Sequence, residues 1–451
     1  MEVNTRELIL DILLEVEKDG RQSQTVIGNV LDKYQFLPKN DRSFITRISE
    51  GTIEYRIQLD YIINRVSSVK VKKMKPVIRE ILRMSVYQMK YMDSVPDRAT
   101  VNEAVKLAQR KGFHNLKSFV NGVLRNAGRR MDEITWPDRK SNPVKYMSVC
   151  YSMPEMLVEQ WCREYGDETC EKMLVSFLKH RPLTVRICRT GHNTEQTIRK
   201  LQNQGVTVTK APYATDGYVL EEYDHLGGLK AFTDGEIQVQ DTSSMLVAQA
   251  ANPASGDFVL DLCAAPGGKS LHAADLMEDT GIVEARDVSD YKVSLIRENI
   301  DRLGLKNIRT QVRDATVYSP GDAGSADIVL CDVPCSGYGV IGKKPDIKYH
   351  ASRERQESLQ KLQREILKNA ASYTKDGGTL IYSTCTIERA ENIDQVQWFI
   401  KHFPFQLESL DPYLDQKLRQ ETTKEGYLQL LPGISDCDGF FLARFKKQEN
   451  I

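Results

Sequence analysis

The stretch Val259-Leu-Asp-Leu-Cys-Ala-Ala-Pro-Gly-Gly-Lys269 joins a short apolar run to a segment with helical spacing. The run Phe258–Leu262 predicts a buried strand, and Ser270–Met277 predicts the helix after it. The two glycines let a ligand approach the backbone closely, and a helix N-terminus presents free N–H groups. The spacing fits neither G-x-G-x-x-G nor the P-loop G-x-x-x-x-G-K-[ST]. For this loop alone, a tight turn without a ligand stays an alternative.

Strand and helix signals alternate in the sequence that follows this loop. Three further short apolar runs predict strands: Gly281–Ala285, Asp327–Leu330 and Thr379–Tyr382. Helix candidates lie between them, at Tyr291–Leu303 and Ser358–Tyr373. Such alternation predicts crossover helices on both faces of a mostly parallel sheet, which is an α/β fold.

Aspartates stand at the ends of two of these strand candidates and of a further stretch, Thr310-Gln-Val-Arg313. They are Asp287, Asp314 and Asp332. Ligands of such sheets bind at the carboxyl ends of the strands, where a carboxylate can accept hydrogen bonds from a ribose diol or reach an adenine edge. One aspartate at a strand end is usually a cap, but three beside a glycine-rich loop favour an adenosine-containing cofactor.

Two cysteines follow two different strands of the same sheet. Cys335 lies in Asp332-Val-Pro-Cys, and Cys385 follows Thr384. A lone cysteine is usually a small buried hydrophobe, but two thiols at one edge indicate covalent chemistry. A thiolate that adds to carbon 6 of a pyrimidine makes carbon 5 able to attack a methyl donor. A second thiol or an aspartate could then take the carbon 5 proton. The attacking thiol needs a nearby cation, and three lysines are candidates by position: Lys269, Lys343 and Lys344.

The first part of the chain is basic and helical. Residues 1–130 contain 24 Lys+Arg and 15 Asp+Glu, although the whole chain has 62 of each. Apolar residues recur at helical spacing, and Thr100 with Glu103 fits a capping box. We expect an all-helical bundle. The basic excess, densest between Lys70 and Arg83, indicates a polyanionic partner, although a solvated helix face would explain it equally well.

Residues 131–140 are polar and predict a linker. After them, a helix signal at Met153–Leu178 precedes strand signals at Leu183–Ile187 and Val206–Val208, and Asn193 is the expected N-cap of a helix between these strands. We therefore expect three domains: a helical domain at 1–135, a small α+β domain at 141–235 and an α/β domain at 236–448.

Composition limits the location and the cofactors. No apolar run has the length that a membrane span needs, and the N-terminus has no secretory apolar region. We therefore expect a cytoplasmic protein with no membrane partner, whose nine cysteines are reduced. They include no C-x-x-C pair, so we expect no metal.

The loops around the two thiols resemble those of the RNA 5-methylcytosine methyltransferases of the Nop/Sun class. The matching stretches are Cys263–Lys269, Asp332–Gly337, Lys344–Asp346, Thr384–Asn392 and Asp438–Phe441. Other stretches resemble a NusB-type RNA-binding helical domain: Asp41–Phe44, Gly51-Thr, Ile81–Gln88, Val101–Val105 and Phe119–Arg125. The combination covers nearly the whole chain and is similar to the RsmB (Sun/Fmu) family of bacterial 16S ribosomal RNA cytosine-5 methyltransferases.

The resemblance implies a Rossmann-like class I methyltransferase domain, which uses S-adenosylmethionine to methylate carbon 5 of one cytidine in free or partly assembled 16S RNA. We expect a monomer. Cys385 would attack carbon 6 and Cys335 would assist product release. Asp287 would take the ribose, Asp314 the adenine side, and Asp332 would lie near the methyl donor and target base. The methionine part would be held by Cys263, Ala264, Ala265, Pro266, Gly267, Gly268 and Lys269.

The chain departs from the family pattern in three places. Cys188 stands where relatives usually have Asn, the strand end Glu284-Ala-Arg-Asp287 is unusually polar, and Gly342-Lys-Lys precedes the Pro-Asp pair. These changes concern RNA docking and strand packing more than the two thiols.

Three other functions compete with this one. The same chemistry could act on transfer RNA or on another ribosomal site. A DNA cytosine-5 methyltransferase would carry its nucleophile in the Pro-Cys motif, and the second cysteine, Cys385, argues against it. A non-catalytic RNA-binding factor would tolerate loss of the thiols, so the intact pair Cys335 and Cys385 argues against that function too.

Overall fold

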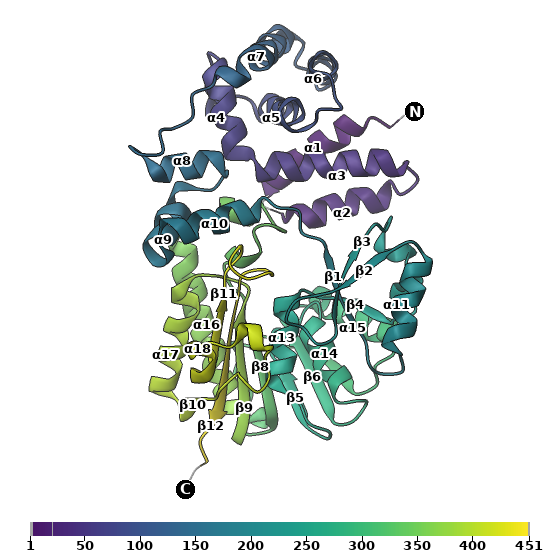
Figure 1. Cartoon of the computed structure of the whole chain (residues 1–451), viewed down its shortest axis with the longest axis vertical. Helices are drawn as coiled ribbons and strands as arrows, with labels where there is room; N and C mark the ends of the chain where they lie inside the picture. Colours follow the sequence, from purple (N-terminus) through teal and green to yellow (C-terminus); the bar gives the residue numbers. More distant parts are fainter. Residues whose placement is uncertain (1–2, 20, 450–451) are drawn as a thin grey trace. The chain divides into compact units, whose positions relative to one another are not determined.

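The computed structural model describes residues 3–19 and 21–449, which form two compact units. The helical unit comprises the described residues up to 179 together with 341–350. The sheet unit comprises 180–340 and the described residues from 351 onward (Figure 1). Each unit has hydrophobic clusters of its own. Among the described residues, no helix combines the length and the apolar character that crossing a bilayer requires.

The helical unit confirms the expected all-helical bundle. Most residues of α5 are buried, including every residue from Ile78 to Gln88 except Arg79, so this helix forms the centre of the bundle. Pro76 occupies its first turn, where a missing N–H costs nothing. The helices are α1 (Thr5–Asp19), α2 (Ser23–Lys33), α3 (Lys39–Glu54), α4 (Arg56–Val66), α5 (Pro76–Tyr91), α6 (Asp97–Arg110), α7 (Lys117–Arg130), α8 (Pro143–Cys150), α9 (Glu155–Tyr165) and α10 (Asp167–Phe177).

Two helix boundaries in this unit differ from the sequence prediction. The capping box at Thr100 is wrong, because Pro96 is the N-cap of α6 and Thr100 already lies inside that helix, buried. The single helix expected across Met153–Leu178 is two helices, since Gly166 adopts a left-handed φ of 80° between α9 and α10.

The basic stretch between Lys70 and Arg83 divides into two parts. Lys70, Lys72, Lys73 and Lys75 are exposed. Arg83 is instead buried and bonds to carboxylates inside the bundle. The polyanion-binding surface expected from this stretch is therefore limited to its lysines.

The first part of the sheet unit is a small antiparallel sheet in the order β2-β3-β1-β4. Its elements are β1 (Leu183–Ile187), α11 (Thr194–Asn203), β2 (Thr207–Lys210), β3 (Gly217–Glu221), α12 (Lys230–Thr233) and β4 (Ile237–Val239). Asn193 caps α11 as expected, because its side chain accepts a hydrogen bond from the Gln196 N–H at 3.1 Å.

The second part is a larger sheet in the order β10-β12-β9-β8-β5-β6-β7, with β11 paired to β12. Strands from β9 to β7 run parallel, whereas β10, β11 and β12 are antiparallel. The expected mostly parallel sheet is thus confirmed, with an antiparallel edge. The strands are β5 (Phe258–Asp261), β6 (Ile282–Asp287), β7 (Ile308–Val312), β8 (Ala326–Asp332), β9 (Thr374–Thr384), β10 (Phe405–Leu407), β11 (Tyr427–Leu430) and β12 (Phe440–Lys447).

Helices cover both faces of this sheet (Figure 1). Alternate strand residues explain the two faces: Val259 and Ile328 pack with α13 and α14, whereas Leu260 and Val329 pack with α16 and α17. The helices are α13 (Thr242–Ala251), α14 (Gly268–Leu276), α15 (Asp290–Leu303), α16 (Arg353–Tyr373), α17 (Ile393–His402) and α18 (Glu421–Glu425).

The two departures that affect strand packing have structural partners. Cys188 is buried beside the apolar cluster of α13 and α14, and burial raises the pKa of its thiol to about 11. On β6, Arg286 bonds to Glu284 at 2.6 Å and to both oxygens of Asp322 at 2.7 and 3.0 Å. Arg309 of β7 binds the other oxygen of Glu284 at 2.6 Å. The charged side chains at the end of β6 therefore pair with opposite charges on β6, on β7 and at Asp322.

A buried ion pair joins the two sheets of the sheet unit. Arg186 of β1 contacts Asp275 of α14, and both side chains are almost fully shielded from solvent. Asp275 also accepts hydrogen bonds from the N–H groups of Arg189 at 3.1 Å and Thr190 at 2.8 Å. The small sheet is thereby tied to the helix that follows the glycine-rich loop.

Residues 341–350 pack in the helical unit although they follow β8 in the chain. Lys348 Nζ donates to the Glu54 carbonyl at 2.7 Å, and the Tyr349 hydroxyl donates to the Ile53 carbonyl at 2.7 Å. The Ser23 hydroxyl also bonds to the Asp346 carboxylate. The helical unit is therefore built from two separate pieces of sequence.

Candidate active site

The structure brings the two sequence-predicted thiols together. Strands β8 and β9 are parallel neighbours, with Asp332 opposite Ser383. Cys335 and Cys385 follow these strand ends, and their Sγ atoms lie 3.3 Å apart. Both residues are partly accessible, whereas the strand-end residues Ser383 and Thr384 are buried. The two thiols therefore open from the carboxyl edge of the sheet.

Hydrogen bonds hold the two cysteine loops against each other. The hydroxyls of Ser336 and Thr386 are 2.6 Å apart. The Gly339 N–H donates to the Cys385 carbonyl at 3.0 Å, and the Gly439 N–H donates to the Gly339 carbonyl at 2.9 Å. A Cβ on Gly339 would lie 2.0 Å from the Gly439 carbonyl oxygen. The loop before β12 thus approaches closely only because both residues are glycines.

A half-buried lysine supplies the positive charge at this edge. Lys269, in the first turn of α14, contacts Asp332 at 2.6 Å, and the Ser383 hydroxyl bonds to the other oxygen of Asp332 at 2.7 Å. Burial works to lower the pKa of Lys269, but the negative charges of Asp332 and Cys385 raise it overall. Lys269 therefore keeps its proton beside the thiol pair. The other candidates, Lys343 and Lys344, belong to the helical unit.

The pKa of one thiol of the pair, that of Cys335, is strongly shifted. Hydrogen bonding to Cys385, together with burial, raises the pKa of Cys335 well above its usual value. The Cys335 thiol therefore keeps its proton and can donate a hydrogen bond to the Cys385 sulfur.

Asp261, at the end of β5, is a site residue that the sequence patterns did not predict. Its carboxylate accepts hydrogen bonds from the Ser270 hydroxyl at 2.5 Å and from the Cys263 N–H at 3.3 Å. The side chain is fully buried, and burial raises its pKa to about 7. Its signal in the sequence is a carboxylate inside an apolar strand. Asp261 braces the start of the glycine-rich loop against α14.

The glycine-rich loop and Asp287 form a cradle at the neighbouring strand ends. Gly267, with a left-handed φ of 107°, is the N-cap of α14, so the first-turn N–H groups of that helix point out of the loop. Asp287 ends β6 and accepts hydrogen bonds from the N–H groups of Ala265 at 3.0 Å and Val288 at 2.8 Å. Asp314 is exposed beyond β7. Free N–H groups and carboxylates in a row fit the amine, carboxylate and ribose hydroxyls of an adenosine-containing cofactor.

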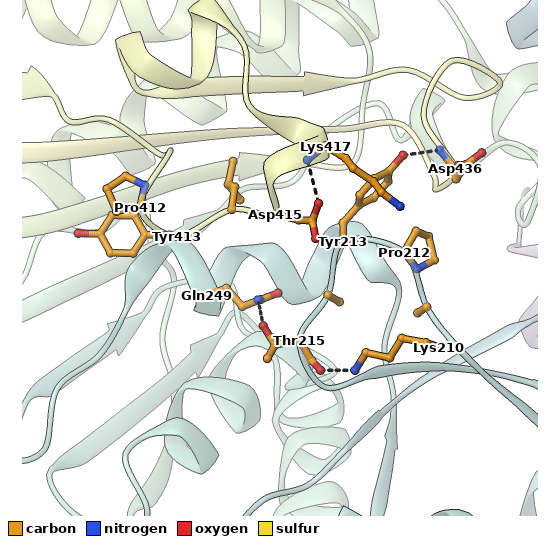
Figure 2. Close-up of a pocket in the computed structure, with 13 residues that line it drawn as sticks. Lys210, Pro212, Tyr213, Thr215, Gln249, Pro412, Tyr413, Asp415, Lys417 and Asp436 are labelled. Carbon is orange, nitrogen blue, oxygen red and sulfur yellow. Dashed lines mark hydrogen bonds between the residues drawn. The ribbon is translucent and has the colours of Figure 1, made fainter.

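A large cavity lies elsewhere in the sheet unit (Figure 2). It measures about 920 Å³, and the loop after β2, α13 and the chain before α18 enclose it. Tyr213 reaches across it and accepts a hydrogen bond from the Asp436 N–H at 3.3 Å. No residue assigned a role from the sequence is among those that line it. This cavity is therefore not part of the thiol site.

The fold and this cradle define the class of the protein: it is a methyltransferase that uses S-adenosylmethionine. The family model described as "16S rRNA methyltransferase RsmB/F" matches residues 248–446. The NusB family matches residues 3–129, and a ferredoxin-like domain of RsmF/B-like methyltransferases matches 153–224. The chain belongs to the ribosomal RNA small subunit methyltransferase B family, and it is an RNA methyltransferase.

Individual relatives support this assignment over the full length. The chain is 37% identical over 448 residues, 99% of each chain, to the probable ribosomal RNA small subunit methyltransferase B of Bacillus subtilis. It is 28% identical to the enzyme of that name from Vibrio vulnificus, over 99% of this chain and 100% of the other. A crystal structure of a methyltransferase homolog from Pyrococcus horikoshii has a TM-score of 0.59 and 25% identity, over 68% of this chain and 99% of that one.

Proposed function

We propose that the protein methylates carbon 5 of a cytidine in small-subunit ribosomal RNA through a covalent adduct between Cys385 and carbon 6. The observation that carries this proposal is the thiol pair, with Sγ atoms 3.3 Å apart, beside the protonated Lys269. A methyl transfer to nitrogen or oxygen needs no thiol. A pyrimidine carbon needs one, because it becomes nucleophilic only after addition at carbon 6.

The residues divide the reaction into steps. The Cys385 thiolate, stabilised by Lys269, forms a bond to carbon 6 of the cytosine. Bound S-adenosylmethionine supplies the methyl group that carbon 5 takes. A base then removes the carbon 5 proton, and the electrons of that C–H bond restore the double bond and expel the Cys385 thiolate. The carboxylate of Asp332 would serve as that base. The Cys335 thiol, which keeps its proton, would assist release by donating a hydrogen bond to the departing Cys385 thiolate.

Carboxylates of the cradle would hold the cofactor in the orientation this step needs. Asp287 would take the ribose hydroxyls and Asp314 the adenine side, while the N–H groups of Gly268 and Lys269 would face the methionine part. Asp332 would connect the two halves of the site, because it contacts Lys269 and ends the strand that leads to Cys335.

RNA would be gripped largely by phosphate contacts. The helical unit exposes Lys70, Lys72, Lys73 and Lys75, which makes binding dependent on salt concentration. The target base has to leave its stack to reach a thiolate, which favours free or partly assembled RNA as the substrate. We expect the enzyme to act as a monomer in the cytoplasm. Transfer RNA is the alternative substrate.

The test is methyl transfer from labelled S-adenosylmethionine to unmodified 16S RNA, with transfer RNA assayed in parallel. Wild type should label cytosine carbon 5, Cys385→Ala should transfer nothing, and Cys335→Ala should accumulate a denaturation-resistant protein–RNA adduct. Label in transfer RNA alone would refute the ribosomal substrate. Activity of Cys385→Ala equal to wild type would refute the covalent mechanism.

A further inference from the structure

Two buried side chains bond to the peptide groups on either side of Cys335. Gln363 of α16 uses both hydrogens of its Nε2: one goes to the Pro334 carbonyl at 3.0 Å, the other to Glu391 Oε2 at 2.8 Å. The same Glu391 oxygen accepts a hydrogen bond from the Ser336 N–H at 3.0 Å. The Pro334 carbonyl belongs to the peptide before Cys335, and the Ser336 N–H belongs to the peptide after it.

We propose that Gln363 and Glu391 are positioning residues that aim the Cys335 thiol by fixing both of its flanking peptides. We call the pair the Cys335 clamp. The inference rests on the proposed function, because it assigns the clamp to the step that Cys335 performs, the release of the methylated product. Neither residue touches a reacting atom, since Sγ of Cys335 faces Cys385.

Burying the two polar side chains of the clamp costs free energy, and the geometry of their hydrogen bonds offers a reason for this cost. Both side chains have no exposed surface, and α16 places Gln363 next to the apolar residues Ile366 and Leu367. An apolar pair of similar volume would avoid the desolvation of an amide and a carboxyl group. What an apolar pair cannot supply is directed bonds to two chosen peptides, and these bonds are what the structure shows.

Glu391 fits the clamp in its protonated form. Its second oxygen, Oε1, and the Oε1 atom of Gln363 are both buried without a hydrogen-bond partner. Protonation of Glu391 would turn one of these buried acceptors into a donor, which an ionised carboxylate cannot supply. Burial also raises the pKa of Glu391, although hydrogen bonds from Ser336 and Gln363 oppose the shift. A neutral Glu391 adds no negative charge beside the thiol.

The experiment compares two leucine substitutions with an isosteric one in the full-length enzyme. Gln363→Leu and Glu391→Leu break the clamp. Glu391→Gln keeps an acceptor for the Ser336 N–H and for Gln363 Nε2, and it is uncharged, as the protonated acid is. Two quantities are measured: methyl transfer to 16S RNA in a single turnover, and the fraction of RNA held in a denaturation-resistant adduct. Cys335→Ala is the reference for a release defect.

A buried glutamine of the next helix gives a matched control. Gln395 of α17 is fully buried, accepts a hydrogen bond from Arg364 and donates to the Ala390 carbonyl, but does not bond to either peptide of Cys335. Gln395→Leu should cost thermal stability comparable to Gln363→Leu and leave adduct release unchanged.

We expect the leucine variants to slow release about tenfold to a hundredfold, while single-turnover methyl transfer stays within about threefold of wild type. Glu391→Gln should release product like wild type. A leucine variant whose methyl transfer and release fall together, or whose release stays unchanged as in Gln395→Leu, would reduce the clamp to a packing feature and overturn the proposal. Release by Glu391→Gln as slow as by Glu391→Leu would overturn the protonated form. Rapid release by Cys335→Ala itself would overturn the proposed role of Cys335 as well.

Discussion

Both units of this protein bury charged side chains, but they balance the charges differently. In the helical unit, the Arg83 side chain is 4% exposed and bonds to both oxygens of Asp60 at 2.7 and 2.6 Å. It also contacts Glu80 at 2.5 Å and Glu17 at 3.4 Å. Arg79 adds a second bond to Glu17 at 2.6 Å. Each carboxylate of this cluster therefore faces at least one guanidinium.

The thiol site is not balanced in this way. Lys269 is the ammonium group placed against Asp332, while Asp261 and the thiol pair lie close by. As a result, burial raises the pKa of Asp261, and burial and hydrogen bonding raise that of Cys335. The comparison teaches that buried charge alone does not mark a reactive site. What distinguishes the thiol site is that groups with too few partners of opposite charge lie there beside a pair of thiols at the carboxyl edge of the sheet.

Removal of Arg83 should cause the largest effect, because it leaves a set of carboxylates without their main partner. We expect Arg83→Met to lose about 3–5 kcal/mol of unfolding free energy. The measurement is the unfolding transition of the helical unit in urea. Methyl transfer by the remaining folded enzyme should change little at low temperature. A loss under about 1 kcal/mol would show that the cluster is not a unit.

Removal of Lys269 should affect activity rather than stability. Lys269→Met takes away the cation beside the thiols, and we expect methyl transfer to fall about a hundredfold, equal to about 2.7 kcal/mol of activation free energy. The control is Lys375→Met, which breaks a 2.6 Å pair with Asp327 at the opposite end of the same sheet. Equal losses of activity in both variants would contradict a special role for Lys269.

The pH dependence of stability should reveal Asp261. Its pKa in the folded protein is about 7, above its value in an unfolded chain, so its stabilising effect is complete below about pH 4 and is lost as the pH rises to about 7. We expect wild type to lose stability relative to Asp261→Asn over this window, by on the order of 1 kcal/mol per pH unit. Hydrogen exchange of β5 amides at several pH values measures it.

Asp327, a carboxylate at the other end of the sheet, should show the opposite pH dependence of stability. Burial works to raise the pKa of Asp327, but the hydrogen bond from Lys375 lowers it overall. Wild type should therefore lose stability relative to Asp327→Asn as the pH falls toward this lowered value. Parallel curves for both variants would contradict the assignment of the two shifts.

The smallest effect should come from an exposed pair of the helical unit. Lys106 contacts Glu103 at 2.8 Å on the surface of α6, three residues apart. We expect Lys106→Ala to change the unfolding free energy by only a few tenths of a kcal/mol. A change as large as that for Arg83→Met would remove the distinction between buried and exposed ion pairs on which the comparison depends.

The sequence predicted what periodicity and strand order control. Alternating strands and helices gave a parallel sheet, and the parallel register then required Cys335 and Cys385 to share one edge. Periodicity says nothing about which charged residue turns inward, so Arg83 was counted with a basic surface. It also says nothing about partners distant in sequence. Gln363 reaches Glu391 across 28 positions, and only the packing of α16 reveals the contact.

The packing of residues 341–350 in the helical unit affects when this unit can finish folding during synthesis. A ribosome finishes the helices up to residue 179 long before it reaches Lys348 and Tyr349, which donate hydrogen bonds to the carbonyls of Glu54 and Ile53. Domains generally fold in order of synthesis, but this helical unit cannot complete its packing until residue 350 has emerged. A proteolytic fragment ending at 179 would therefore lack part of its own interior, and one beginning at 180 would carry that part with nothing to bind.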